Sequence, residues 1–418
     1  MTDLDWIPAA LAGARAQAMG ALLRYFRNLD IAEEAFQEAC IKALKNWPQN
    51  GPPRDPAAWL IFVGRNAAID AVRKKSREQA LPDEQNLSDL DDAESDLADR
   101  LDSADYRDDV LRLLFVCCHP DLPGTQQIAL ALRIVSGLTV SQIARAFLVN
   151  DAAMEQRITR AKRKVAAAGV PFETPSAADR AERLAAVMAM IYLVFNEGYS
   201  ASGGEAASRA SLCDEAIRLG RLLLRLFPAE PEVMGLVALM LLQHSRGAAR
   251  FDAYGEIILL DDQDRTRWHR GMITEGLALI DKAIRHRRAG AYQIQSAIAA
   301  LHARAATPAE TDWTQIDLLY ASLEALEPSP VITLNRAVAV FKARGAEEAL
   351  AMIEPLAQRL VNYFHFYGVK GGLLLQLNRD EEAHIAFDRA IALANSPAEA
   401  NHIRMHIDRI KKNNLTQR

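Results

Sequence analysis

The sequence predicts an all-α protein, in which two small helical domains precede a helical repeat array (an α-solenoid). Alanine, leucine and arginine dominate, and apolar residues recur at three- and four-residue spacing, as in Ile143, Ala146 and Phe147. No segment shows the period-two alternation of a half-buried strand. Near the C-terminus the stretch at 345–356 resembles the stretch at 379–390, and a repeat of this length indicates stacked helix pairs.

Composition excludes several classes of protein. The chain has 418 residues and a net charge of −5, which argues against bulk nucleic-acid binding. No apolar run is long enough to span a membrane, and the N-terminus lacks the pattern of a signal peptide, so we expect a cytoplasmic protein. The cysteines show no C-x-x-C spacing, and Cys117-Cys118-His119 has no second ligand pair nearby. We therefore expect reduced, buried thiols and neither a metal nor a cofactor.

Helix breakers and charge divide the chain. The breakers are the stretch from Pro48 to Pro56, a long acidic segment, and "GVPFETPS" at 169 to 176. The predicted parts are a first domain at 1–79, an acidic flexible linker at 80–105, a second domain at 106–170 and the array at 178–418.

The second domain ends in a predicted helix-turn-helix, "GLTVSQIARAFLVNDAAMEQRITRAKRK". Thr139 can cap its first helix together with Gln142 in a capping box, and Asn150 or Asp151 can cap its second. The turn carries Leu148 where many such units have glycine. The inward stripe of the second helix is predicted to comprise Met154, Ile158, Ala161 and Val165.

The opposite face of that second helix is polar and basic. Amide and guanidinium groups can read base edges in the major groove, and cations can bind phosphates. A basic amphipathic helix can also be a plain solvated surface, and that alternative stays open from the helix alone. The residues of this face are Glu155, Gln156, Arg157, Thr159, Arg160, Lys162, Arg163 and Lys164.

The first domain contains an acidic helix, a proline-rich loop and a helix that becomes steadily more basic. "AEEAFQEACIKAL", "WLIFVGRNAAIDAVRKK" and the later helix-turn-helix, in this order, resemble the two conserved domains of an extracytoplasmic-function sigma factor of bacterial RNA polymerase. The resemblance covers most of residues 15 to 168. "LFVCCHPDLPGTQQIALALR" departs from the usual entry to the second domain, and is similar to a subgroup with a long helical C-terminal extension.

The resemblance implies partners and site residues. Core RNA polymerase would be contacted by Glu34, Gln37 and Glu38, and the helix-turn-helix would read the −35 element of promoter DNA. An unpaired base of the −10 element would enter a pocket under the loop from Trp47 to Ala57, at a cost of a few kcal/mol that pocket contacts offset. The side chains implied for the −10 element are Trp47, Asn50, Arg54, Arg65, Asn66, Arg73, Lys74 and Lys75.

The charge changes sign at the end of the basic helix. Four cations lie between Arg73 and Arg77, and thirteen acids with two bases follow from Glu78 to Asp109. By the resemblance, the cations would hold promoter phosphates, which positions DNA without reading its sequence. The acidic linker would mimic nucleic acid in a positively charged channel of the polymerase. A disordered, solvated linker is the simpler alternative.

The repeat array has a period of about 34 residues, which is that of a tetratricopeptide repeat. "GAEEALAMIEPL" at 345 to 356 aligns with "RDEEAHIAFDRA" at 379 to 390. Weaker similarity to the same pattern occurs at 213 to 232 and at 275 to 287. Helix pairs of this kind bury their faces by stacking, so we expect one superhelix with a concave groove for a protein or peptide regulator.

Two segments of the array are unusually polar, "YLVFNEGYSASGGE" and "LLDDQDRTRW". A carboxylate-based catalytic or metal site is one interpretation. Helix caps, hydrogen bonds between repeats and a docking surface within the molecule are favoured over it. The residues assigned to this interdomain or regulatory role are Asn196, Glu197, Tyr199, Asp262, Asp264, Arg265 and Trp268.

These observations favour an alternative sigma factor, not an enzyme, whose C-terminal extension regulates activity in cis. A second hypothesis is a helix-turn-helix regulator with a peptide-binding array, although such a protein would not need the first domain. A third hypothesis, a hydrolase or transferase within the array, is disfavoured because the sequence shows no nucleophile, phosphate-binding loop or metal cluster there.

Overall fold

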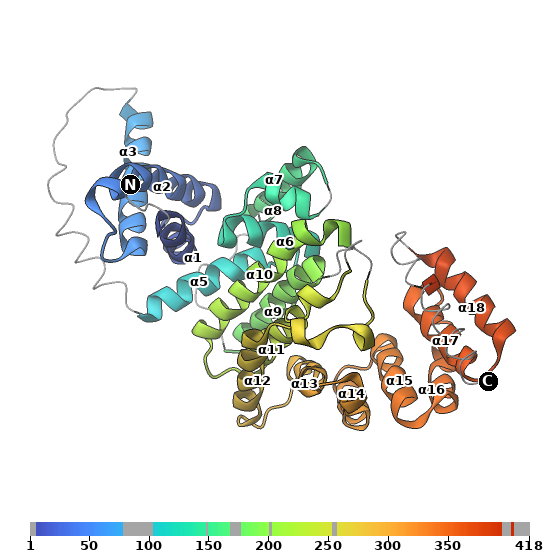
Figure 1. Cartoon of the computed structure of the whole chain (residues 1–418). Coiled ribbons are helices and arrows are strands. Elements are labelled where there is room, and N and C mark those ends of the chain that lie inside the picture. Colours follow the sequence, from blue (N-terminus) through green and yellow to red (C-terminus); the bar gives the residue numbers. More distant parts are fainter. Residues whose placement is uncertain are drawn as a thin grey trace. The chain divides into compact units, whose positions relative to one another are not determined.

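The computed structural model describes residues 6–77, 103–147, 149–167, 177–199, 203–252, 257–394 and 403–404. Within these residues helices joined by loops make up the chain, and an isolated bridge between Phe251 and Ile257 is the sole extended pairing. The predicted all-α fold class is confirmed. The helices gather into two compact units, Met1–Glu197 and Gly198–Arg418, and the chain can be followed through them by colour in Figure 1.

Three long helices begin the first unit: α1 (Trp6–Phe26), α2 (Leu29–Asn50) and α3 (Pro56–Arg77). Each of the three packs against the other two. Asn28 caps α2, because its side-chain oxygen accepts hydrogen bonds from the backbone N–H groups of Asp30 and Ile31. The inward stripe of α2 follows a helical period and consists of Ala32, Glu33, Ala35, Phe36, Ala39, Ala43 and Trp47.

Trp47 is part of this helix and its core, so the predicted start of the −10 loop at Trp47 is wrong. Its side chain is 2% exposed, and its ring lies 5.8 Å from that of Trp6 and 5.4 Å from that of Trp59. Pro48 stands in the last turn of α2, and the helix ends at Gly51, whose φ of 80° favours glycine. The loop therefore begins at Gly51, one helical turn later than predicted.

The second half of the first unit starts with α5 (Ser103–Cys117), which packs on α1. It continues through α6 (Gly124–Ala131), the π-helix η1 (Leu132–Ser136), α7 (Val140–Ala146) and α8 (Asp151–Ala167).

Helices α7 and α8 form the predicted helix-turn-helix. The capping box is confirmed: Thr139 accepts from the N–H of Gln142, and the Gln142 side chain accepts from the N–H of Thr139. Asn150 caps α8 by accepting from the N–H of Ala153. The predicted inward stripe is confirmed as well, since Met154, Ile158, Ala161 and Val165 are all buried. Leu148 in the turn lies outside the described residues.

Helix α9 (Ala177–Tyr199) follows, and the division between the two units falls within its last turn. The second unit is a succession of helices in which each long helix from α10 to α18 packs on its neighbour in sequence. These helices are α10 (Gly203–Leu226), α11 (Pro231–His244), α12 (Arg270–Ile284), α13 (Ala291–Arg304), α14 (Trp313–Leu326), α15 (Pro330–Arg344), α16 (Ala346–Ile353), α17 (Phe364–Gln376) and α18 (Asp380–Leu393).

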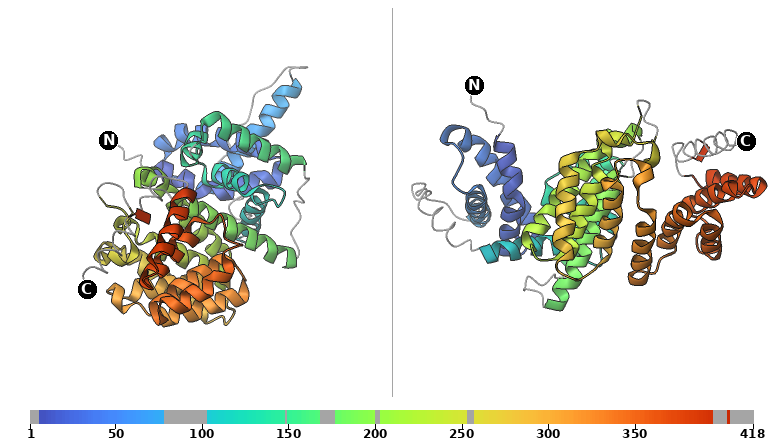
Figure 2. Two further views of the ribbon diagram at one scale, coloured as in Figure 1. Left: turned by 90° about the vertical axis from the view of Figure 1, so that its right-hand side faces the viewer. Right: turned by 60° about the horizontal axis from the view of Figure 1, so that its bottom comes forward.

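The last four helices show the repeat that the sequence predicts. The pair α15 and α16 begins at Pro330 and Ala346, and the pair α17 and α18 begins at Phe364 and Asp380, so the spacing within each pair is the same. The two pairs share one core of buried residues, and Figure 2 shows them side by side in both views. Gly371 lets α17 approach α18, because a Cβ there would lie 2.8 Å from the ring of Phe387.

A buried carboxylate joins the first of these pairs to the helix before it. Asp317 of α14 accepts a hydrogen bond from Arg336 at 2.7 Å and another from Arg344 at 2.6 Å. Burial alone raises the pKa of Asp317, but the hydrogen bonds from the two guanidinium groups outweigh it and lower that pKa. The helices of the array are thus held by charge as well as by apolar burial.

The thiols are free, and Cys117, Cys118 and Cys213 are buried. Burial raises the pKa of Cys118 and of Cys213 to about 12, and raises that of Cys117 as well. Cys40 is half-buried, and its pKa rises to about 11 for the same reason. None of these thiols is therefore a reactive thiolate near neutral pH.

Replacing Gly64 of α3 with alanine should destabilise the first unit. The new Cβ would lie 2.8 Å from the carbonyl oxygen of Ala35, so α3 must move away from α2 at a cost of about 1–3 kcal/mol. Gly13→Ala is the control, because nothing lies within 4 Å of a Cβ at that exposed helical position. Alanine there should stabilise by about 0.5–1 kcal/mol. Chemical denaturation of both variants measures the difference, and equal effects would contradict the close approach of the two helices.

Candidate nucleic-acid and polymerase interface

The polar face of α8 is open to solvent, as direct contact with DNA would require. Glu155, Gln156, Thr159, Arg160, Arg163 and Lys164 are exposed, and Arg157 is half-buried. These side chains, all predicted to contact the −35 element, lie together on one helix, opposite the stripe that holds α8 against α6 and α7. The Lys164 ammonium also donates to the backbone carbonyl of Asp121.

The predicted polymerase contact lies on α2. Glu34, Gln37 and Glu38 are exposed there. Their neighbour Glu33 is not, because its side chain is turned inward and the residue is 5% exposed. An isolated carboxylate at such a position would be costly to desolvate, so the charges around it decide whether it can be tolerated.

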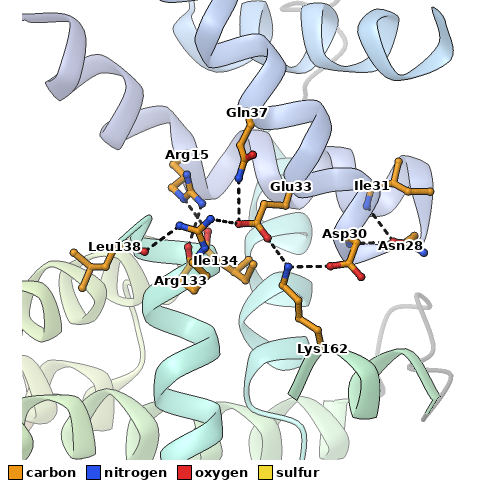
Figure 3. A network of polar contacts seen from close by, with 10 residues as sticks. All are labelled: Arg15, Asn28, Asp30, Ile31, Glu33, Gln37, Arg133, Ile134, Leu138 and Lys162. Atoms are coloured by element: carbon orange, nitrogen blue, oxygen red, sulfur yellow. Dashed lines mark hydrogen bonds and ion pairs between the residues drawn. The ribbon is translucent and has the colours of Figure 1, made fainter. Parts of the chain in front are cut away.

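Cations of the second domain supply those charges, as Figure 3 shows. One oxygen of Glu33 lies 2.8 Å from the guanidinium of Arg133 in η1, and the other lies 2.6 Å from the ammonium of Lys162 in α8. The same ammonium lies 2.9 Å from the carboxylate of Asp30. We call Asp30, Glu33, Arg133 and Lys162 the interdomain ion cluster. It joins the acidic helix of the first domain to the second helix of the helix-turn-helix.

Arg15 of α1 strengthens the same junction. Its guanidinium donates to the backbone carbonyls of Ile134 at 2.9 Å and Arg133 at 3.1 Å, and it lies 4.8 Å from the ring centre of Phe36. Gly137 ends η1 with a φ of 77°, and a Cβ there would lie 2.8 Å from the Arg15 side chain. A glycine is thus required both for the turn and for the approach of Arg15.

Lys162 departs from its predicted place on the solvent-facing polar side of α8. It is half-buried and paired with two carboxylates. Burial alone lowers the pKa of Lys162, but hydrogen bonds to Glu33 and Asp30 outweigh it and raise that pKa, so the ammonium stays charged. The sequence shows a basic helix face but not a partner on a distant helix, so the pairing could not be foreseen.

The side chains predicted for the −10 element lie around the loop between α2 and α3. Asn50, Arg54, Arg65 and Asn66 are exposed, and the guanidinium of Arg65 lies 4.5 Å from the ring centre of Tyr25. Trp47 is buried, so its side chain cannot stack on a base in this arrangement. Arg73, Lys74 and Lys75 belong to α3, but their side chains lie outside what the structure describes, as does nearly all of the acidic linker predicted at 80–105.

The first polar segment of the array is tied to the loop after α11. Tyr199 accepts a hydrogen bond from Arg246 at its hydroxyl and another from Arg250 at its backbone carbonyl, each at 2.7 Å. The Arg250 guanidinium lies 3.7 Å from the centre of the Tyr199 ring. Asn196 and Glu197 are half-buried in the last turns of α9.

The second polar segment reaches α13. Arg265 is buried and donates to the backbone carbonyls of His302 at 2.9 Å and Ala305 at 2.6 Å. Asp264 caps a short 3-10 turn, Asp262 is exposed and Trp268 is 3% exposed. These contacts are caps and hydrogen bonds between successive helices, one of the interpretations that the sequence favours over catalysis.

The described residues show neither a metal site nor a membrane-spanning helix. No group of three or more histidine, cysteine, aspartate or glutamate residues there could hold a metal ion. No described helix is long and apolar enough to cross a membrane.

Comparison with known proteins agrees with the geometry. Residues 14–78 match Sigma-70 region 2, residues 112–165 match Sigma-70 region 4, and residues 183–284 match a family of unknown function (DUF6596). The chain is therefore a sigma factor, a transcription initiation factor that binds core RNA polymerase and promoter DNA. It is 73% identical over 410 residues to an uncharacterized protein of Rhizobium meliloti (strain 1021), covering 98% of this chain and 97% of that protein, and it belongs to the same family. No solved structure matches the chain.

Replacing Lys162 with methionine should loosen the junction between the two sigma domains. Glu33 would keep Arg133 as a partner but lose the closer of its two cations, while the apolar stem of the side chain is retained. Amide hydrogen exchange should accelerate in α2 and α8 and stay unchanged in α17 and α18. Arg163→Met is the matched control, because Arg163 is an exposed cation on the same helix. Equal exchange in the two variants would show that the ion cluster does not hold the domains.

Proposed function

We propose that this sigma factor is of the extracytoplasmic-function class and that its C-terminal unit regulates it in cis. One observation carries the proposal. The same chain contains Sigma-70 regions 2 and 4 and, after them, a helical array in which the last two helix pairs repeat. Region 4 would read the −35 element through α8, and region 2 would open the −10 element with the loop after α2. The array, which we interpret as tetratricopeptide-like, would take the part that a separate anti-sigma protein plays elsewhere.

We infer from the interdomain ion cluster that the arrangement described here is a resting state. Lys162 lies among the DNA-facing residues of α8 yet pairs with Glu33 and Asp30 of the helix proposed to bind polymerase. A sigma factor engaged at a promoter must place its two domains on separate elements, so this contact has to break. Polymerase and DNA would supply new partners for the separated charges, and each can shift the equilibrium only by as much as it prefers the open state.

Run-off transcription with core polymerase tests regulation by the array. The full chain is compared with a chain that ends near Pro175, and the two should differ in activity. The sign of the difference tells whether the array restrains or supports initiation. A full chain with Glu34→Lys and Glu38→Lys serves as a control that should not bind the polymerase, because both exposed acids of the proposed contact are reversed. Equal transcription by the full and shortened chains would refute regulation in cis.

Replacing Arg160 with alanine should weaken promoter binding without unfolding α8, since this side chain is exposed. A base-reading arginine should cost about 1–3 kcal/mol and relax specificity at one position, while a phosphate contact should weaken all sequences alike. Binding is measured on a library of −35 variants at fixed salt. Arg157→Ala is tested beside it, and unchanged discrimination in both variants would exclude α8 as the reading helix.

A further inference from the structure

A cavity of about 360 Å³ lies inside the second unit, among α11, α13, α14 and α15. The short segment from Leu260 to Trp268, part of the polar stretch "LLDDQDRTRW", forms one side of it. Cavities of about 300–1,000 Å³ are the usual size for small-molecule sites. Most of its wall is apolar, with Leu242, Ile298 and Leu323 among the lining residues.

Three lining residues each carry a buried nitrogen without a hydrogen-bond partner in the described part of the chain. They are Nε of Arg246, Nε1 of Trp268 and Nδ1 of His302. Leaving a buried polar group unsatisfied destabilises a fold by about 1–3 kcal/mol, so three around one cavity are hard to explain by folding alone. Because these nitrogens are also closed off from the cavity, a bound molecule with acceptor atoms would satisfy them once the side chains packed over them turn aside.

The charges that act on the wall are mixed but mainly positive, since Arg246 and Arg265 outnumber Asp261, which also pairs with Lys342. Arg246 is the one charged side chain that lines the cavity in the described ranges, and the guanidinium of Arg265 lies 5.1 Å from the Trp268 ring centre behind it. Burial, together with the charges of Arg246 and Arg265, lowers the pKa of His302 to about 4. His302 is therefore neutral near pH 7, and its free ring nitrogen can donate or accept according to the tautomer.

We propose that this cavity binds a small amphipathic carboxylate. The carboxylate would accept hydrogen bonds from Arg246 and Trp268, and an apolar body would pack on the leucine and isoleucine side chains. An extended peptide is less suited to a cavity of this volume. The proposed site joins the region of unknown function at 183–284 to the repeat helices that follow it. It goes beyond the function proposed above and does not depend on it.

The test uses the full chain labelled with ¹⁵N at tryptophan, whose five indole N–H groups give separate resonances. The Trp268 resonance is identified with Trp268→Phe, and octanoate is then titrated against 1-octanol, which has the same apolar body without the charge. Octanoate should shift the Trp268 resonance saturably at up to millimolar concentrations, and octanol should bind at least about tenfold more weakly.

Two variants locate the binding site. Arg246→Met should weaken octanoate about tenfold or more, while Arg270→Met, which changes an exposed arginine outside the cavity, should not. Arg246 also donates to the Tyr199 hydroxyl, so Tyr199→Phe controls for the loss of that hydrogen bond and should bind octanoate normally. Ala299→Phe fills the cavity and should abolish the shift while the other four indole resonances stay in place.

Several results would overturn the proposal. An unshifted Trp268 resonance would mean that ordered water alone satisfies the buried nitrogens. Equal binding of octanol would show that the negative charge contributes nothing to affinity. An unchanged octanoate affinity in Arg246→Met would show that Arg246 does not bind the carboxylate. A peptide with a free C-terminal carboxylate that binds where octanoate does not would show a peptide site instead. None of these readouts involves transcription, so they stand apart from the sigma-factor tests.

Discussion

Close approach between helices is the constraint on which this structure depends. With no sheet in the described residues, each helix buries its apolar face only against other helices. Glycines stand where backbones meet: Gly20 of α1 faces the backbone of Asp109, and Gly235 of α11 faces that of Gln293. A Cβ would lie 2.8 Å from the first backbone and 2.6 Å from the second. A larger residue at Gly20 would push α5 away from α1, and one at Gly235 would push α13 away from α11.

The interdomain ion cluster illustrates how a buried charge can favour one arrangement without adding much stability. Desolvating Glu33, Arg133 and Lys162 is unfavourable, and their mutual attraction offsets that desolvation only when the geometry is right. The cluster therefore penalises every packing of the two domains that leaves Glu33 buried without its cations. Separation into water, where each charge regains its hydration, is penalised far less. A contact of this kind suits domains that must come apart when a larger partner arrives.

Much of the fold could be predicted from the sequence because the signals are local. The stripe from Met154 to Val165, the Thr139 capping box and the repeated helix pairs all depend on residues within a few turns or one repeat. Trp47 is misplaced by the sequence prediction because a proline at position 48 suggests the end of a helix. The stripe through Ala39 and Ala43, and Gly51 as the C-cap, are the signals that locate it correctly.

The site was predictable only in part, for a different physical reason. The exposed faces of α2 and α8 follow from periodicity, but pairs such as Glu33 with Lys162, or Arg265 with the end of α13, depend on tertiary packing. Arg133 and Arg15 carry no signal of their own, since a single arginine in a helix is ordinarily a surface residue. The cavity beside Trp268 likewise forms only when four helices and a turn are brought together.

The pairing of Lys162 has a consequence for how promoter binding responds to salt. A free lysine that reaches a DNA phosphate displaces a condensed counterion, and this release makes affinity fall steeply as salt rises. Lys162 is already neutralised by Glu33 and Asp30, so under the proposed opening its transfer to DNA would exchange one anionic partner for another. Salt also screens the pair that is being broken. Under this proposal the acidic helix would compete with the promoter for Lys162, and both contacts would weaken as ionic strength increases.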